Sequence, residues 1–303
     1  MNTVKVSAEH DYEVLIGCDW SSVLIEKIHN RTRVAVIASD QYSPDLSALK
    51  SLHCDLHVFE VPDGEDGKSS GVLLNLWNWL GAAGFTRSDL IVGIGGGAIT
   101  DLAGFAAATW LRGVDWIAVP TSLAGMVDAS VGGKTGINSE YGKNLIGAFH
   151  SPLSVIIDPS FLETLSQRDI SAGMAEVLKC GFIADPEILK VAAQCDATSL
   201  VSNRAAVLDL ITRAVTVKAT VVSADFKESF AREALNYGHT LGHAIEKYSK
   251  YQMRHGEAVA IGMVFIAELA SARSLIDAQT VQMHRDLLVR YRLPTTFERS
   301  AWQ

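Results

Sequence analysis

Residues Leu90 to Leu111 read LIVGIGGGAITDLAGFAAATWL, and this stretch has the pattern of a strand, a turn and a helix. Its first five residues form a short apolar run, which is typical of a strand buried in a parallel sheet. Three glycines follow at 95–97, and 98–111 is long enough for a helix. Asp101 stands in the middle of the stretch, and because a charged group is costly in lipid, we do not expect a membrane crossing here.

The same alternation extends through the first half of the chain. Apolar runs predict further strands at 5–6, 13–17, 34–38, 57–61, 116–119 and 155–158, with a helix at 69–80. Alternating strands and helices predict an α/β domain with a parallel sheet covered on both faces. Beyond residue 160 we expect only helices, at 170–180, 186–194, 205–222, 233–248, 256–275 and 280–291. A chain of this length usually forms two domains, here predicted as 1–160 and an all-α domain 161–303.

The composition excludes several classes of protein. Of the 303 residues, 48% are hydrophobic and 20% are charged, as in an ordinary globular protein. The net charge of -8 argues against a nucleic-acid partner, since binding to a polyanion requires clustered Lys and Arg. The four cysteines have no paired spacing, and the N-terminus lacks the apolar core of a secretory signal. We therefore expect a cytoplasmic protein without disulfides.

The stretch from Arg232 to Glu246 carries candidate metal ligands. Helical spacing would place its polar side chains on one face, namely Arg232, Asn236, His239, His243 and Glu246. With His255 nearby in sequence and Glu176 from another helix, these imidazoles offer a two-histidine, one-carboxylate metal site. A solvated helix face remains the alternative for the histidines, and a surface ion pair with Lys179 remains the alternative for Glu176.

Two glycine-rich segments are candidates for phosphate binding. The glycines at 95–97 lie between a strand and a helix, where backbone N–H groups receive a pyrophosphate, although a tight structural turn explains them equally well. Asp40 follows an earlier strand and is either a ribose ligand or a turn residue. The segment 128–144 is polar and glycine-rich, and we expect it to be a long functional loop. It is not a P-loop, because Asp128 stands where that motif needs glycine. It offers Asp128, Lys134, Lys143 and Asn144 to an anionic, hydroxylated molecule, or else to solvent.

Six phrases together resemble one family. They are GGGAITDLAGF from Gly95, PTSLAGMVDASVGGKTGIN from Pro120, GKNLIGAFH from Gly142, GMAEVLK from Gly173, LNYGHTLGHAIE from Leu235 and RHGEAV from Arg254. In this order and over nearly the whole chain, they resemble the 3-dehydroquinate synthase family of the sugar phosphate cyclases.

The resemblance implies a Rossmann-like NAD domain, an α-helical metal domain and an active site in the cleft between them. It implies that Glu176, His239 and His255 hold zinc, with cobalt as a substitute, and that His243 lies beside the substrate. The substrate, a small anionic sugar phosphate, is assigned to Asp128, Lys134, Asn144, Lys179, Lys218, Arg232 and Asn236. The nucleotide side is assigned to Asp40, Glu65, Lys68, Gly95, Gly96, Gly97, Asp101, Thr121, Ser122 and Lys143. Arg112 matches a residue offered across a homodimer interface.

In the family reaction NAD oxidises a ring hydroxyl of the heptulosonate phosphate, phosphate leaves, the hydride returns, and an aldol step closes the ring. One pocket must therefore hold a nicotinamide, a metal and several cations. Three alternatives stay open: a metal-dependent polyol or glycerol-phosphate dehydrogenase, a cyclase for another sugar phosphate, and a truncated, weakly active protein that binds NAD and metal. The last arises because family members continue with an Asp-Lys-Lys segment, whereas this chain stops at Gln303, so we expect weaker substrate binding and slower turnover.

Overall fold

The computed structural model describes residues 1–42, 44–51, 54–226 and 231–298. A seven-stranded sheet organises the first half of the chain, in the order β1-β2-β9-β6-β5-β3-β4. Its strands are β1 (Asn2–Ser7), β2 (Asp11–Ile16), β3 (Arg33–Ser39), β4 (Asp55–Val61), β5 (Leu90–Gly95), β6 (Asp115–Pro120) and β9 (Ser154–Ile157). All neighbouring pairs are parallel except β1 with β2. The predicted strands and the parallel sheet are therefore confirmed.

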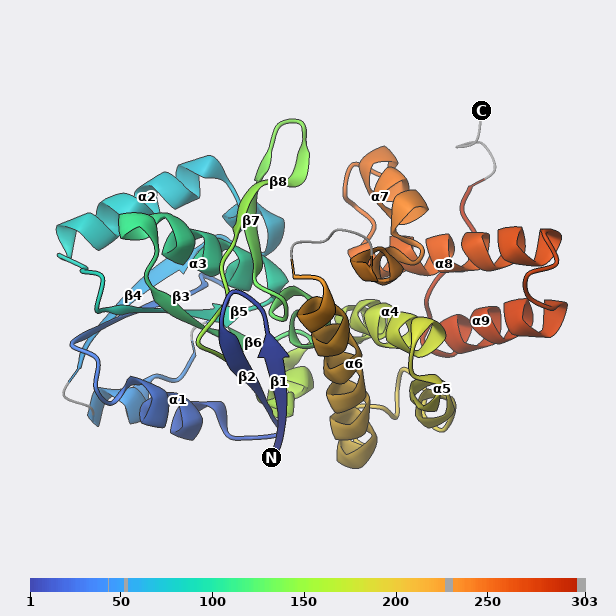
Figure 1. The fold of residues 1–303 in the computed structure, drawn as a ribbon, viewed down its shortest axis with the longest axis horizontal. Helices are drawn as coiled ribbons and strands as arrows, with labels where there is room; N and C mark the ends of the chain where they lie inside the picture. The colour runs from blue at the N-terminus through green and yellow to red at the C-terminus, as the bar shows by residue number, and fades with distance from the viewer. Residues whose placement is uncertain (43, 52–53, 227–230, 299–303) are drawn as a thin grey trace.

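Helices cover both faces of this sheet. α1 (Trp20–Ile28) lies on one face, and α2 (Ser70–Ala82) and α3 (Gly97–Thr109) lie on the other (Figure 1). Every residue of β5 is buried, as expected for a central strand covered on both sides. The segment 90–111 thus occupies the middle of the α/β layer, and α3 begins within its glycine turn.

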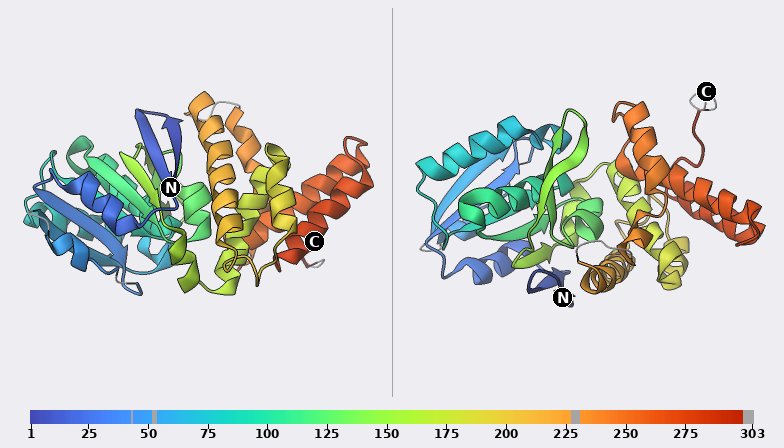
Figure 2. Two further views of the ribbon diagram at one scale, coloured as in Figure 1. Left: turned by 90° about the horizontal axis from the view of Figure 1, so that it is seen from below. Right: turned by 45° about the horizontal axis from the view of Figure 1, so that its top comes forward.

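The second half of the chain is helical. Its helices are α4 (Gln167–Ile183), α5 (Pro186–Ala193), α6 (Arg204–Ala224), α7 (His239–Tyr248), α8 (His255–Ala272) and α9 (Ala278–Arg290). They stack beside the sheet half in all three ribbon views (Figures 1 and 2). Among the described residues, α8 is the one helix long and apolar enough to cross a membrane, but half of it is buried in the molecule, as in a core helix.

The prediction of a long loop at 128–144 is wrong for most of its length. β7 (Lys134–Ser139) and β8 (Gly142–Phe149) form an antiparallel hairpin there. A Cβ on Gly136 would lie 2.6 Å from the carbonyl oxygen of Ile146, and one on Gly147 would lie 2.2 Å from that of Thr135. The glycines that suggested a loop instead allow two strands to approach closely.

The prediction of one continuous helix through 233–248 is also wrong. A short 3-10 helix, Ala231–Asn236, ends before Gly238, whose φ of +79° is left-handed, and α7 begins at His239. A Cβ at Gly238 would lie 2.6 Å from the amide nitrogen of Met263 and 2.9 Å from the carbonyl oxygen of Val259. The chain turns here because glycine alone tolerates both this backbone conformation and the contact with α8.

The two halves share one hydrophobic core. α6 lies against β1, where Asn2 Nδ2 donates to Thr212 Oγ1 at 3.1 Å and the Ser7 amide donates to Ser223 Oγ at 3.0 Å. A single buried cluster runs from Val6 to Leu293. The domain boundary near residue 160 therefore stays a prediction, although every strand of the described residues ends by Ile157.

Candidate active site between the sheet and the helices

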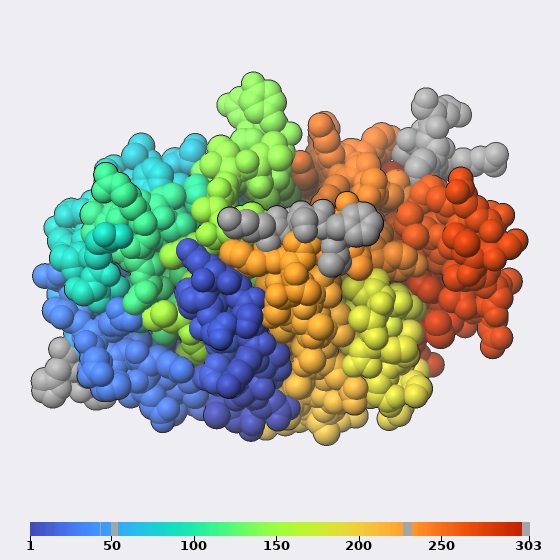
Figure 3. All heavy atoms as spheres, in the orientation of Figure 1, coloured from blue at the N-terminus to red at the C-terminus, as the bar shows by residue number. Residues whose placement is uncertain are grey.

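A cleft of about 870 Å³ lies between the hairpin and the helical half. In the space-filling view the hairpin rises beside α7, and atoms of the two halves meet below it (Figure 3). Most residues selected from the sequence line this cleft: Glu65, Lys68, Gly97, Asp101, Asp128, Lys134, Lys143, Asn144, Glu176, Lys179, Lys218, Arg232, Asn236, His239, His243 and His255. Residues more than 150 positions apart are therefore brought to one site.

Glu176, His239 and His255 form a compact set of metal-type donors. Their ligand atoms all lie within 4.8 Å of one another. Oε1 of Glu176 is 3.7 Å from Nε2 of His239 and 3.4 Å from Nε2 of His255. Both carboxylate oxygens of Glu176 are buried; Lys179 Nζ pairs with Oε2, and Oε1 is the oxygen that faces the two imidazoles. A buried carboxylate oxygen that faces two imidazole nitrogens fits a divalent metal ion.

In both His239 and His255 the Nδ1 atom, which faces away from Glu176, has a hydrogen-bond partner. His239 Nδ1 lies 3.2 Å from the carbonyl oxygen of Tyr237, which only accepts, so this nitrogen donates and Nε2 keeps its lone pair. Burial lowers the pKa of His239 to about 4, so the ring is neutral at pH 7, as a metal ligand must be. His255 Nδ1 lies 3.0 Å from Oε2 of Glu246. Glu246 thus orients a candidate ligand without belonging to the Glu176 set.

A second donor set overlaps the first. His243, Glu246 and His255 also lie within 4.8 Å of one another. Glu246 is already paired with Lys143, whose Nζ is 3.1 Å from Oε1, and with His255. The His243 side chain is exposed to the cleft, unlike His239. The Glu176 set is therefore the better metal candidate, because Oε1 of Glu176 faces two imidazole nitrogens, whereas both oxygens of Glu246 already have other partners.

Three buried cations line the helical side of the cleft: Lys179, Lys218 and Arg232. Lys179 pairs with Glu176 three residues earlier on α4. Burial alone would lower the pKa of Lys179, but the carboxylates of Glu176 and Asp128 outweigh burial and raise it. Lys218 donates to Oδ1 of Asp128 at 2.5 Å. Burial would raise the pKa of Asp128, yet Lys218 and Lys179 hold it down at about 2. An anionic ligand entering here meets fixed positive charge in a site of low dielectric constant.

A polar cluster lines the opposite wall, beside the start of α3. Lys68 is buried, pairs with Asp101 Oδ2 at 2.6 Å and also donates to Asn144. Gly97, the first residue of α3, lies on the cleft, and a Cβ there would be 2.9 Å from Cβ of Ala129. The free backbone N–H groups at this helix start are suited to an anion.

Five residues selected for the nucleotide lie outside the cleft lining: Asp40, Gly95, Gly96, Thr121 and Ser122. They nevertheless share one edge of the sheet, because each ends or follows one of the neighbouring parallel strands β3, β5 and β6. The Thr121 amide donates to the Gly95 carbonyl at 2.9 Å across this edge. In open parallel sheets this is the edge at which nucleotides bind. Arg112 lies elsewhere, exposed after α3.

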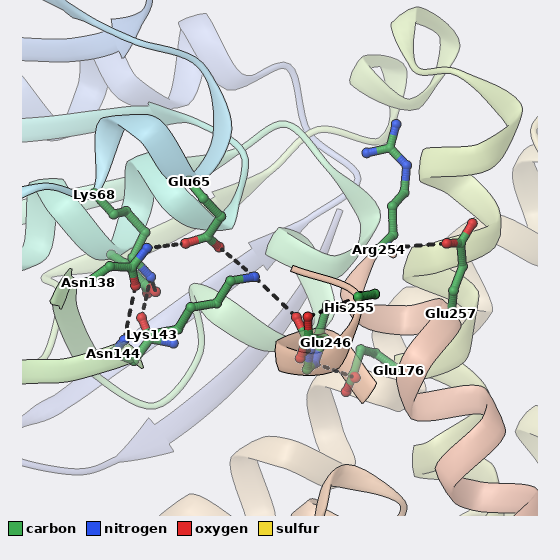
Figure 4. A network of polar contacts seen from close by, with 12 residues as sticks. Glu65, Lys68, Asn138, Lys143, Asn144, Glu176, Glu246, Arg254, His255 and Glu257 are labelled. Atoms are coloured by element: carbon green, nitrogen blue, oxygen red, sulfur yellow. Dashed lines mark hydrogen bonds and ion pairs between the residues drawn. The ribbon is translucent and has the colours of Figure 1, made fainter. Parts of the chain in front are cut away.

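Lys143 connects the two walls of the cleft. Its Nζ lies 3.8 Å from Glu65 Oε1 and 3.1 Å from Glu246 Oε1, and it sits 4.6 Å above the ring of Tyr251. Figure 4 shows the resulting chain of contacts, which runs from Lys68 through Asn144 and Asn138 to Glu65, and from Glu65 through Lys143 to Glu246 and His255. The hairpin is therefore tied electrostatically to the helices that carry the candidate ligands.

Sequence reasoning missed supporting residues. The Tyr12 hydroxyl accepts from the Gly132 amide at 2.9 Å and holds the segment that leads to Lys134, although 120 residues separate the two. Asn138 donates to Glu65 and accepts from the Asn144 amide at 3.0 Å. These contacts leave no pattern in the sequence, because a single distant polar residue has no periodicity.

Two family models match consecutive parts of the chain. The model described as 3-dehydroquinate synthase N-terminal matches residues 58–172, and the model described as 3-dehydroquinate synthase C-terminal matches residues 173–303. The chain belongs to the 3-dehydroquinate synthase family. It is 50% identical to the 3-dehydroquinate synthase of Mycobacterium leprae, over 99% of this chain and 84% of that protein. It is 51% identical to that of Thermobifida fusca, over 96% and 80%.

Solved structures of related cyclases have the same fold. A 2-deoxy-scyllo-inosose synthase, complexed with carbaglucose-6-phosphate, NAD+ and Co2+, superposes with a TM-score of 0.88 at 26% identity, over 98% of this chain and 84% of that chain. The 2-epi-5-epi-valiolone synthase of Streptomyces hygroscopicus subsp. jinggangensis 5008, with NAD+ and Zn2+ bound, gives 0.88 and 26% over 97% and 84%. An iron-containing alcohol dehydrogenase, at 15% identity and a TM-score of 0.69, shares the fold alone.

Proposed function

We propose that this protein is a 3-dehydroquinate synthase, which converts 3-deoxy-D-arabino-heptulosonate 7-phosphate into 3-dehydroquinate and phosphate with NAD and a divalent metal. Membership of the family supports this function. The structural observation that carries it is the buried Glu176 carboxylate, which faces two imidazole nitrogens beside three buried cations. The cleft would take the metal, the doubly anionic sugar and the nicotinamide end of NAD.

Glu176, His239 and His255 would hold the metal, zinc in the first instance with cobalt as a substitute. When bound, the metal polarises a substrate hydroxyl and stabilises negative charge that develops on its oxygen. The Tyr237 carbonyl and Glu246 accept from Nδ1 of His239 and His255, and these contacts would aim Nε2 of each ring at the metal. The protein's contribution at this centre would be to orient the two imidazoles. His239 is already neutral, whereas burial of His255 is outweighed by Glu176 and Glu246, which raise its pKa to about 10, so that metal binding would release a proton from this ring.

The cationic wall would bind the anionic groups of the substrate. Lys179, Lys218 and Arg232 are buried, so their attraction to a phosphate or carboxylate is weakly screened. Asp128, Lys134, Asn144 and Asn236 line the same cleft and would bind hydroxyl and phosphate oxygens. His243 is exposed to the cleft beside His239, their ring centroids 5.4 Å apart, and would lie next to the substrate.

NAD would bind along the edge of the sheet between β3 and β6 and the start of α3. When bound, it takes up a hydride from the substrate and returns it in the same turnover. The backbone N–H groups at the start of α3 would receive its pyrophosphate, and Asp40 would accept from a ribose hydroxyl. Glu65, Lys68, Asp101, Thr121, Ser122 and Lys143 complete the proposed nucleotide side.

We also propose a homodimer in the cytoplasm, with Arg112 offered to the neighbouring subunit. Arg112 is exposed, and the hairpin strand β8 exposes Leu145 and Ile146, apolar side chains that a second subunit would cover. All four cysteines are free thiols, which agrees with a reducing compartment. Sedimentation velocity on the 303-residue chain, with Arg112→Ala as a kinetic comparison, tests the dimer.

The decisive experiment measures phosphate release and absorbance at the NADH wavelength together. The zinc- and NAD-loaded protein should release phosphate from the heptulosonate phosphate and form 3-dehydroquinate without accumulating NADH. Steady NADH accumulation would instead identify a polyol or glycerol-phosphate dehydrogenase. Phosphate release from a hexose phosphate but not from the carboxylated substrate would identify another cyclase, and NAD and metal binding without turnover would identify an inactive binding protein.

A further inference from the structure

Tyr237 connects α9 to a candidate metal ligand. Its hydroxyl lies 3.1 Å from Nε2 of His284 on α9, and its carbonyl oxygen lies 3.2 Å from Nδ1 of His239. We propose that His284 is a positioning residue of the metal centre, which acts through Tyr237 to keep His239 oriented toward the metal. This inference rests on the proposed function, since it assigns His239 to a metal.

The direction of each hydrogen bond follows from its partners. His284 Nδ1 lies 2.8 Å from the carbonyl oxygen of Thr280, which can only accept, so Nδ1 carries the proton. Nε2 of the neutral ring is then an acceptor, and the Tyr237 hydroxyl donates to it. His284 is only 4% exposed, so solvent has little access to replace this acceptor. The tyrosine hydroxyl is thereby held in one place.

The His284 ring is itself fixed by α4. It stacks on Phe182 with ring centroids 3.7 Å apart and an interplanar angle of 9°. Phe182 is on α4, the helix that also carries Glu176. This stacking contact therefore connects α4, which carries Glu176, to His284, which holds Tyr237 just before His239.

The Tyr237 side chain has space to move if this anchor is removed. A second cavity, of about 390 Å³, is lined by Tyr237 together with Ile183, Gly238, Thr240 and Ile266. Tyr237 directly precedes Gly238, the left-handed residue at which the chain turns into α7. Rotation of the peptide between them would carry the Tyr237 carbonyl away from His239 Nδ1, and that ring would lose the contact that selects its tautomer.

The test compares zinc affinity in five variants by competition with a chromophoric chelator. His284→Phe keeps the ring that stacks on Phe182 and removes the acceptor, and Tyr237→Phe removes the donor. Each should weaken zinc binding about 10-fold, the lower end of the usual effect of an outer partner, and the double variant should lose no more than either single one. His284→Gln, which retains an acceptor, should stay near the parent. Gln282→Ala, an exposed change on the same helix, should have no effect.

The cobalt-loaded proteins give a second readout independent of turnover. In His284→Phe and Tyr237→Phe the visible absorption of bound Co2+ should shift, because the geometry of His239 changes, while the parent and His284→Gln spectra should coincide. Unchanged zinc affinity in both phenylalanine variants would overturn the inference. Equal losses in His284→Gln would also overturn it, since they would show packing instead of a hydrogen bond. A parent chain that binds no zinc would overturn the proposed metal site and this inference together.

Discussion

His255 Nδ1 lies 3.0 Å from Glu246 Oε2, and this contact turns the opposite ring nitrogen toward Oε1 of Glu176 at 3.4 Å. Glu246 is nearly buried, and its other oxygen pairs with Lys143. Burial opposes ionisation of Glu246, but the bonds from His255 and Lys143 hold its pKa at about 2. An ionised carboxylate behind a candidate metal ligand is the arrangement found where imidazole orientation matters.

Glu246→Gln should weaken zinc binding about 10- to 100-fold, because an amide oxygen orients the His255 ring less strongly than a carboxylate does. Competition titration with a chelator measures the change. Lys143→Met is the matched control, since it removes the other partner of Glu246 and leaves the contact with His255. An equal loss in Lys143→Met would show that the ion pair across the cleft, not the orientation of His255, is responsible.

His239→Ala and His243→Ala should have different effects. The first should abolish both zinc binding and turnover, because a ligand atom is lost. The second should keep one zinc per chain and lower kcat about 100-fold or more, the usual effect of a residue that exchanges protons with the substrate. Metal analysis by mass spectrometry beside a phosphate-release assay separates them. Loss of zinc from His243→Ala would mean that the set of His243, Glu246 and His255 is the true site.

The Asp128 and Lys218 pair should show strong coupling. Lys218→Met leaves Asp128 without its nearest cation, and we expect a loss of about 2–3 kcal/mol in unfolding free energy, below the full cost of a broken buried pair because the Asp128 side chain is 33% exposed. Adding Asp128→Asn should restore part of that loss, since the unpaired charge is removed. Urea unfolding of the parent, Lys218→Met, Asp128→Asn and the double variant gives the coupling energy of the pair. Strictly additive losses in unfolding free energy would contradict a direct interaction.

Gly238→Ala should cost at least about 2 kcal/mol in unfolding free energy, because a non-glycine residue is strained at a φ of +79° and its Cβ would collide with the backbone of α8. Zinc affinity should fall as well, since His239 follows directly. Gly71→Ala is the control: a Cβ there meets nothing within 4 Å, and stability should be unchanged or slightly higher. Normal stability and zinc binding in Gly238→Ala would show that the turn adapts to a side chain.

The periodicity of hydrophobic residues predicted the strands and helices well, but it did not predict the hairpin at 134–149 or the helix break at Gly238. Every expected strand and helix outside 128–144 and 231–248 is present, with ends shifted by a few residues. At 136 and 147 glycine meant close strand pairing, and at 238 it meant a helix break, yet all of them look alike in a sequence. Only the neighbouring backbone, supplied by β8, β7 and α8, decides which use a glycine has.

Local hydrophobic patterns and short motifs were enough to predict the α/β and α-helical halves, the family and the candidate residues. Tertiary structure decided how the residues of the polar stripe from Arg232 to Glu246 divide their roles. Gly238 separates Arg232 and Asn236 from the helix of the histidines, and Glu176 comes from α4 to face His239 and His255. Glu246 and Tyr237 then hold the outer ring nitrogens. Such pairings depend on distances between separate helices, which no spacing along the chain encodes.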